Sequence, residues 1–162
     1  MEQTSTPSAA PPPIELPTRR ASRELSRRLA PCLAAGDLVI YSGPLGSGKT
    51  FLVRALGRAL GLAADVPVTS PTFTLVNEYP TEPPLCHADL YRLGDVGQVE
   101  MLGLRERRDE GSLVLVEWGE PFIDVLGGDA LVISLASSPR RAALQATGPR
   151  SGAVLAALLK NA

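Results

Sequence analysis

Apolar and polar residues follow two different periods along the chain, and the changes between them predict its elements. Leucines recur every four residues between Thr18 and Gly36, with arginines between them, which predicts a helix. The uninterrupted apolar run 38–41 is instead typical of a strand that is buried on both faces. A second helix is expected after the glycine-rich stretch that follows this run, ending near Leu60.

Shorter elements are predicted in the second half of the chain. Residues 73–79 and 85–91 are expected to form two strands joined by a turn with prolines, and Asp95 is expected to cap a short helix. Residues 112–116 are typical of another buried strand. Two more strands and a closing helix are expected over 131–135, 142–146 and 152–160. Strands that alternate with helices indicate an α/β domain of the P-loop type, with a mostly parallel or mixed central sheet.

The length of 162 residues predicts one domain, and its first residues differ in composition from the rest. Residues 1–17 hold five prolines among serine, threonine and alanine, which predicts a disordered tail ahead of a domain over 18–162. This stretch lacks the basic start and apolar segment of a secretory signal. No apolar run approaches the ~20 residues of a membrane span, so we expect no membrane association.

Charge and cysteine content narrow the possible roles. The net charge of −1 argues against a nucleic-acid binder that works by phosphate neutralisation alone. Cys32 and Cys86 fit no metal-binding spacing, and two cysteines make a poor disulfide framework. We expect both to be reduced thiols in a cytoplasmic protein.

The stretch GPLGSGKT, residues 43–50, lies between the predicted strand 38–41 and the second helix. It matches the P-loop pattern G-x-x-x-x-G-K-[ST], whose glycines let successive backbone N–H groups point at phosphate oxygens. Lys49, one of only two lysines, would supply a point charge to the β- and γ-phosphates, and the Thr50 hydroxyl would ligate Mg²⁺. The alternative is a glycine-rich turn that only caps a helix, and the flanking strand and helix argue against it.

A P-loop needs a carboxylate for its metal, usually at the end of a neighbouring buried strand. Glu117 directly follows the strand 112–116 and is the first candidate, although aspartate is more usual there. Asp89 is the second candidate, for a water or the metal shell, and an ordinary role at a strand end fits it equally well. Thr72 is expected to reach the phosphate or the metal shell from a switch-like segment, 70–73, for which a structural turn is the alternative.

Several other side chains have an ordinary structural role as the alternative to a functional one. His87, the only histidine, is either a hydrogen-bonded structural residue or a general base. Trp118, the only tryptophan, is a core residue, a platform for a base or an interface anchor. Arg140 and Arg141 follow a predicted strand, where solvated surface charge is the simpler explanation.

Other classes of P-loop protein have sequence features that this chain lacks. No N-K-x-D motif selects guanine, and the chain is too short for helicase or AAA-type machinery. A small-molecule kinase remains the alternative to an ATPase, and it would need an acceptor pocket and a basic lid. Arg105, Arg107 and Arg108 would imitate such a lid, but the acidic residues between them favour a solvated helix face.

Four motifs together resemble the TsaE family, also called YjeE. In chain order they are GPLGSGKT at 43–50, TSPTFTLVNEY at 69–79, HADLYR at 87–92 and LVEW at 115–118. The resemblance extends from about Ile14 to the C-terminal helix. The family usually has aspartate where Pro44 stands and proline where Gly119 stands, and neither position is a glycine, lysine or hydroxyl of the P-loop.

The resemblance implies a small Mg²⁺-dependent ATPase that is required for threonylcarbamoyladenosine (t6A) formation in tRNA. The family acts with two larger proteins that transfer the threonylcarbamoyl group, and ATP hydrolysis is thought to reset that complex between turnovers. tRNA would be met mainly through these partners. Carried over by position, the implied catalytic residues are Lys49, Asp89 and Glu117, and the implied metal ligands are Thr50 and Glu117. The implied nucleotide contacts are Arg19, Gly43, Gly46, Ser47, Gly48, Lys49, Thr50, Thr72, Trp118 and Arg140.

Overall fold

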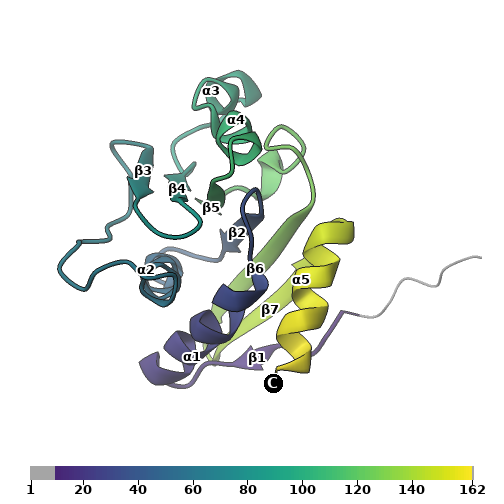
Figure 1. Ribbon diagram of the computed structural model, residues 1–162. Helices are drawn as coiled ribbons and strands as arrows, with labels where there is room; N and C mark the ends of the chain where they lie inside the picture. Colours follow the sequence, from purple (N-terminus) through teal and green to yellow (C-terminus); the bar gives the residue numbers. More distant parts are fainter. Residues whose placement is uncertain (1–9, 162) are drawn as a thin grey trace, which may run out of the picture.

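Seven strands form one sheet in the computed structural model, which describes residues 10–161 (Figure 1). Their order across the sheet is β1-β7-β6-β2-β5-β4-β3. The strands are β1 (Ile14–Glu15), β2 (Leu38–Ser42), β3 (Val76–Tyr79), β4 (Leu85–Asp89), β5 (Leu113–Glu117), β6 (Ala130–Ser137) and β7 (Arg140–Ala146). The four central strands β6, β2, β5 and β4 are parallel, whereas β3, β7 and β1 pair antiparallel at the two edges. The expected α/β class with a mixed sheet is confirmed.

Helices cover both faces of the sheet, which gives three layers (Figure 1). The helices are α1 (Arg19–Leu29), α2 (Lys49–Ala59), α3 (Val96–Glu100), α4 (Leu104–Asp109) and α5 (Pro149–Lys160), with 3₁₀ turns at Ala30–Cys32 and Glu120–Phe122. Apolar side chains of α1, α2 and α5 pack on one face, and those of α3, α4 and the second 3₁₀ turn pack on the other.

The central strand β2 shows why its sequence is apolar without interruption. Val39 and Tyr41 belong to the core beneath α1, α2 and α5, whereas Leu38 and Ile40 belong to the core beneath α3 and α4. Successive side chains of a strand point to opposite faces, so a strand covered on both sides must be apolar at every position. The same holds for residues 113–116 of β5, which are all buried, and this strand ends on the buried carboxylate of Glu117.

The N-terminal boundary of the domain differs from the prediction. Residues 1–17 were expected to form a disordered tail, but Ile14 and Glu15 form β1, which pairs antiparallel with β7. Leu16 follows this strand and is buried in the core. A strand of two residues shows no periodicity, which is why the proline-rich composition misled the prediction. Residues 1–9 of the predicted tail lie outside the described residues.

Several element boundaries also differ from the expected ones, and two of these differences have a local cause. The first helix begins after its cap Thr18, whose hydroxyl accepts a hydrogen bond from the N–H of Ala21. It ends at Leu29, and the chain continues as the 3₁₀ turn Ala30–Cys32, which contains Pro31. Proline lacks the N–H that an α-helix needs at this point. The strand expected from residue 73 begins only at Val76, since Leu75 has a positive φ of 68°. No helix among residues 10–161 is long and apolar enough to cross a membrane.

Candidate functional site

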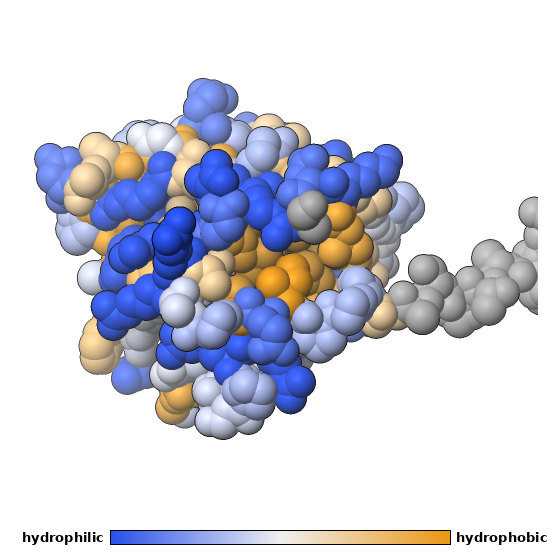
Figure 2. All heavy atoms as spheres, turned by 90° about the horizontal axis from the view of Figure 1, so that it is seen from below, coloured by the Kyte–Doolittle hydropathy of each residue, from blue (hydrophilic) through white to orange (hydrophobic). Residues whose placement is uncertain are grey.

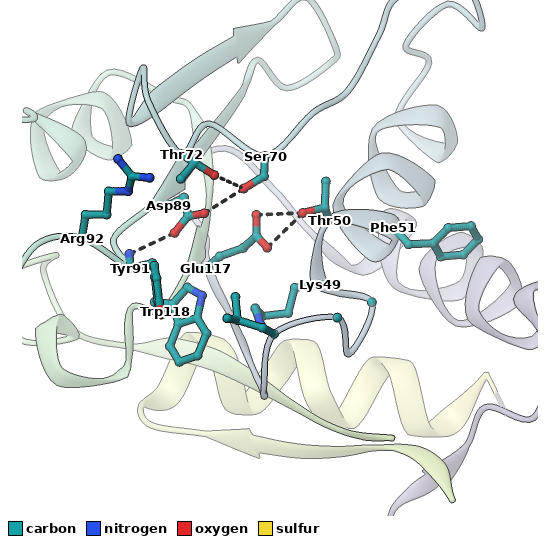
Figure 3. A pocket seen from close by; sticks show the side chains of 13 residues that line it. Lys49, Thr50, Phe51, Ser70, Thr72, Asp89, Tyr91, Arg92, Glu117 and Trp118 are labelled. Atoms are coloured by element: carbon teal, nitrogen blue, oxygen red, sulfur yellow. Dashed lines mark hydrogen bonds between the residues drawn. The ribbon is translucent and has the colours of Figure 1, made fainter. Parts of the chain in front are cut away.

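A cavity of about 440 Å³ lies at the edge of the sheet where the parallel strands end (Figure 3). β2 runs directly into the glycine loop, while Asp89 and Glu117 are the last residues of β4 and β5 and are register partners. Parallel strands present their carboxyl ends at one edge, and this edge is where open α/β sheets bind ligands. Residues that line the cavity include Gly46, Gly48, Lys49, Thr50, Thr72, Asp89, Glu117 and Trp118.

The glycine loop has a backbone that only glycines adopt without strain. Gly43, Gly46 and Gly48 have φ values of 138°, 77° and 104°. A Cβ at Gly43 would lie 2.8 Å from both the carbonyl oxygen of Leu135 and the hydroxyl of Ser47, so no larger residue fits there. Gly48 is the N-cap of α2 and offers no side chain, which leaves the first N–H groups of the helix for a ligand. The loop therefore has the form of an anion cradle.

Lys49 is the first residue of α2, and its side chain returns over the loop. Its ammonium donates hydrogen bonds to the carbonyl oxygens of Gly43 at 2.6 Å and Pro44 at 3.0 Å. It also lies 4.4 Å from the centre of the Trp118 ring. Burial lowers the pKa of Lys49, although the negative charge of Glu117 acts in the opposite direction. A partly desolvated cation at the loop is suited to binding phosphate oxygens.

Glu117 connects the glycine loop to the neighbouring strand. The Thr50 hydroxyl donates to the Glu117 carboxylate, with distances of 3.1 Å to Oε1 and 3.3 Å to Oε2 (Figure 3). On the other side, His87 Nε2 lies 2.7 Å from Glu117 Oε2, and His87 is fully buried. Of the two roles open for His87, the structure supports that of a hydrogen-bonded residue, because the imidazole lies behind the carboxylate and does not line the cavity.

Asp89 holds the segment that carries Thr72. The Ser70 hydroxyl donates to Asp89 Oδ2 at 2.7 Å, and the backbone N–H of Tyr91 donates to Oδ1 at 2.9 Å. Ser70 Oγ also lies 3.2 Å from the hydroxyl of Thr72 (Figure 3). Asp89 is thus a register partner of Glu117 but makes its side-chain contacts with a different segment, so the two carboxylates have distinct positions.

Trp118 occupies one wall of the cavity because its backbone turns sharply. It has a positive φ of 62°, which is uncommon for a bulky residue and found most often at functional sites. Its ring centre lies 4.9 Å from that of Tyr91. The next residue is Gly119, where a Cβ would lie only 2.7 Å from Val116 Cγ1. Gly119 stands where the resembled family usually has proline, and the close packing of Val116 against it leaves no room for a Cβ.

Two predicted nucleotide contacts lie on the other side of the loop. Arg19, at the start of α1, and Arg140, at the start of β7, both line a smaller cavity of about 150 Å³. Ser47, Gly48 and Phe51 also line it, so this cavity adjoins the main one. The Ser47 hydroxyl is buried and has no hydrogen-bond partner among the described residues. The structure therefore brings Arg19 and Arg140 together, although they are far apart in the sequence.

The residues present fit a magnesium ion that is shared with a phosphate ligand. Among residues 10–161 no cluster of three or more histidine, cysteine or acidic side chains is arranged to hold a metal on its own. Thr50 and Glu117 instead offer a hydroxyl and a carboxylate that already touch each other at the cavity. Mg²⁺ is usually held in this way, by one or two carboxylates together with substrate phosphates and waters.

The arginines of α4 do not form a lid over the site. Neither cavity beside the glycine loop is lined by Arg105, Arg107 or Arg108. Arg107 donates to Glu78 at 2.8 Å and to the carbonyl oxygen of Leu102 at 2.6 Å. Arg108 is half-buried and donates to three backbone carbonyls, those of Gly36, Leu126 and Gly128. The expected solvated helix face is therefore wrong for Arg108, whose guanidinium connects the loops that carry these carbonyl groups.

The wall of the larger cavity includes three aromatic or charged residues that were not selected from the sequence. Phe51 lines both cavities, and Tyr91 and Arg92 line the larger one. Arg92 lies with its guanidinium carbon 4.7 Å from the ring centre of Phe73. Each of the three is near a selected residue in the sequence, since Phe51 follows Thr50 directly and Tyr91 and Arg92 end the motif that contains Asp89. That proximity was the signal that could have identified them.

Comparison with known proteins gives consistent matches. The family model described as "Threonylcarbamoyl adenosine biosynthesis protein TsaE" matches residues 16–143. A relative from Streptomyces coelicolor, named tRNA threonylcarbamoyladenosine biosynthesis protein TsaE, is 48% identical over 113 residues, which are 67% of this chain and 74% of the relative. A relative of the same name from Mycobacterium bovis is 37% identical over 129 residues, covering 74% of this chain and 76% of the relative.

A solved structure shows the same fold. The crystal structure of YdiB from Bacillus subtilis superimposes with a TM-score of 0.72 at 25% sequence identity, covering 93% of this chain and 95% of the other. The similarity extends over nearly the whole of both chains.

Proposed function

The chain belongs to the TsaE family of tRNA threonylcarbamoyladenosine biosynthesis proteins, and we propose that it is the subunit that binds and hydrolyses ATP in that pathway. In this proposal it does not modify tRNA itself. It acts in the cytoplasm with the two larger proteins that transfer the threonylcarbamoyl group, and ATP turnover resets their complex between cycles.

One observation carries the proposal. The hydrogen bond from Thr50 to Glu117 joins the last residue of the glycine motif to the carboxylate at the end of β5, inside the cavity that Lys49 also lines. A phosphate cradle, a cation and a hydroxyl–carboxylate pair at one point are the groups that a P-loop enzyme uses for phosphoryl transfer. A glycine turn that only capped a helix would not need the buried carboxylate.

Each residue then has a defined task. The N–H groups of the glycine loop and of the first turn of α2 bind phosphate oxygens, and the Lys49 ammonium exchanges its bonds to Gly43 and Pro44 for bonds to phosphate. Thr50 and Glu117 would hold Mg²⁺, which when bound neutralises charge on the β- and γ-phosphates. Asp89 fixes the segment of Ser70 and Thr72, so that these hydroxyls respond to the γ-phosphate or to its attacking water.

The smaller cavity is suited to the nucleoside. Arg19 and Arg140 line it, and their cationic groups would contact a base or its ribose. Phe51 lines both cavities and marks the point where they adjoin. In this proposal the nucleoside binds on the α1 side of the glycine loop.

The experiment that tests the proposal is tRNA modification reconstituted with the two larger proteins under multiple-turnover conditions. We expect repeated cycles only when this protein and Mg²⁺-ATP are present. Cycles that continue equally well without the protein, or with its Lys49→Ala variant, would overturn the proposal. Labelled γ-phosphate that appears on a small molecule instead of as free phosphate would establish the alternative, a small-molecule kinase.

A further inference from the structure

A third cavity, an open groove, lies between α1 and α2 beside the two cavities of the glycine loop and shares Phe51 with both. Its volume is about 430 Å³. It is lined by Arg23, Arg27, Phe51, Arg54, Ala55, Arg58 and Ala59. We refer to it as the arginine groove, after its four arginines. Figure 2, which views the molecule from below, shows hydrophilic residues gathered over the part of this face where α1 lies.

The arginines lie together because of helical periodicity on two packed helices. Arg23 and Arg27 are four residues apart on α1, and Arg54 and Arg58 are four residues apart on α2. Residues at this spacing share one face of a helix, so each helix presents two guanidinium groups to the same groove. The local charge is therefore strongly positive, although the net charge of the whole chain is only −1.

Most of this charge has no acidic partner within the chain. Among residues 10–161, Arg27 is the only arginine of the groove in a salt bridge, with Glu24 at 2.7 Å. Arg54 donates to the carbonyl oxygen of Val68 at 3.0 Å, and Arg58 to those of Ala63 and Val66, both at 2.6 Å. Carbonyl oxygens orient a guanidinium without cancelling its charge. The groove thus offers oriented cations that can bind a ligand with several negative charges.

An aromatic ring lies among these cations. Phe51 is half-buried at the start of α2, and the guanidinium carbon of Arg23 lies 5.6 Å from its ring centre. The side chains of Ala55 and Ala59 add small apolar surface to the groove. Arginines that bind phosphates, next to an aromatic face on which a base stacks, are the combination that binds single-stranded nucleic acid. An acidic peptide would use the charges but has no group that needs the ring.

We propose that the arginine groove binds a single-stranded segment of RNA, with backbone phosphates at Arg23 and Arg54 and a base beside Phe51. This inference rests on the proposed function, because the pathway of the TsaE family supplies tRNA as the polyanion. It also goes beyond that function, because RNA then contacts this chain directly and is not held by the larger proteins alone.

The test is fluorescence anisotropy of labelled, unmodified tRNA with the full chain, over a range of salt concentrations. Each phosphate contact to a single strand contributes ~0.7 to the slope of log affinity against log salt. The double variant Arg23→Gln with Arg54→Gln should therefore lose about 1.4 from the slope and bind about 25-fold more weakly in about 0.1 M salt. The matched control is Arg105→Gln with Arg141→Gln, which removes the same charge from exposed residues outside the groove and should bind like the wild type.

Two further measurements make the result decisive. Arg23→Gln alone, which removes no side-chain hydrogen bond among residues 10–161 and only a ring contact, should give about half of the change in slope even if the double variant is unstable. The proposal is overturned if the arginine variants keep wild-type affinity, if the control loses as much, or if a labelled polyglutamate peptide binds in the groove more tightly than tRNA. ATP binding, measured separately with Lys49→Ala as its negative control, tests the proposed function independently of the groove.

Discussion

His87 Nε2 and Glu117 Oε2 lie 2.7 Å apart on the neighbouring strands β4 and β5, and the imidazole is fully buried. The carboxylate that faces Thr50 is therefore held from behind by a side chain without access to solvent. A buried partner of this kind fixes the orientation of a metal-binding carboxylate, and its loss usually reduces metal affinity or activity.

The first prediction concerns this contact. The variant His87→Asn should lower Mg²⁺-dependent ATP hydrolysis by roughly 10-fold or more, because Glu117 loses its fixed orientation. The affinity for ATP without Mg²⁺ should stay close to that of the wild type, since the glycine loop is unchanged. Hydrolysis measured over a magnesium titration checks this, and a thermal melt verifies the fold. A folded variant with an unchanged magnesium requirement would show that His87 is only a core residue.

The second prediction concerns Lys49. The variant Lys49→Ala should abolish nucleotide binding or turnover, because the loop loses the ammonium group that returns over it. Titration calorimetry with ATP measures the effect. The chain provides a matched control in its other lysine, Lys160, which is exposed at the end of α5, and Lys160→Ala should bind like the wild type. Wild-type affinity in Lys49→Ala would disprove the role assigned to Lys49.

The third prediction separates the two carboxylates. Glu117→Ala should lose Mg²⁺-dependent hydrolysis while keeping part of its nucleotide affinity, because the glycine loop and Lys49 remain. Asp89→Asn should have a smaller effect on the magnesium requirement, since Asp89 is bonded to Ser70 and not to Thr50. Hydrolysis and ATP binding are measured for both variants. If only Asp89→Asn loses activity, Glu117 is not the metal ligand.

The fourth prediction concerns residues 70–73. Ser70 and Thr72 are connected to Asp89 through two hydrogen bonds at the cavity wall, and Phe73 is 84% exposed. Few contacts hold such a segment, so a γ-phosphate should change its protection. We expect hydrogen exchange in this segment to be slower in the complex with an ATP analogue than in the complex with ADP. Identical exchange in the two complexes would favour a structural turn.

The fifth prediction concerns stability at high pH. Cys32 and Cys86 are both free, as expected from the sequence, and burial raises the pKa of the Cys86 thiol to about 11. The thiol of the unfolded chain has a pKa of about 8.5. At a pH between these two pKa values, the thiol is deprotonated in the unfolded chain but keeps its proton in the folded protein. The free energy of unfolding therefore falls as the pH rises through that range.

Urea unfolding at about pH 8 and about pH 10.5 measures this fall. It should be larger in the wild type than in Cys86→Ala by about 2 kcal/mol, from 1.36 kcal/mol per pKa unit. Burial also raises the pKa of Tyr41, but that contribution is common to both proteins and cancels in the comparison. The control Cys32→Ala should behave like the wild type. An equal fall in Cys86→Ala would exclude Cys86 as the source.

The sequence by itself determined those features that depend on neighbouring residues. The conformation of the glycine loop depends on the loop residues themselves, because Gly43, Gly46 and Gly48 have no side chain and adopt positive φ angles without strain. The buried strands expected at 38–41 and 112–116 were predictable from their apolar runs, since a strand that is covered on both faces is apolar along most of its length. Order and spacing were also sufficient to identify the family, which the family model confirms.

The tertiary structure decided those features that join distant parts of the chain. The short strand β1 exists only because β7 offers it an edge, and no pattern within residues 14–15 announces it. Arg19 and Arg140 share a cavity because α1 and β7 meet beside the glycine loop. His87 reaches Glu117, thirty residues away, because β4 and β5 are parallel neighbours in register. Such contacts depend on the order and register of the strands, which are set by packing of the whole core and not by any single segment.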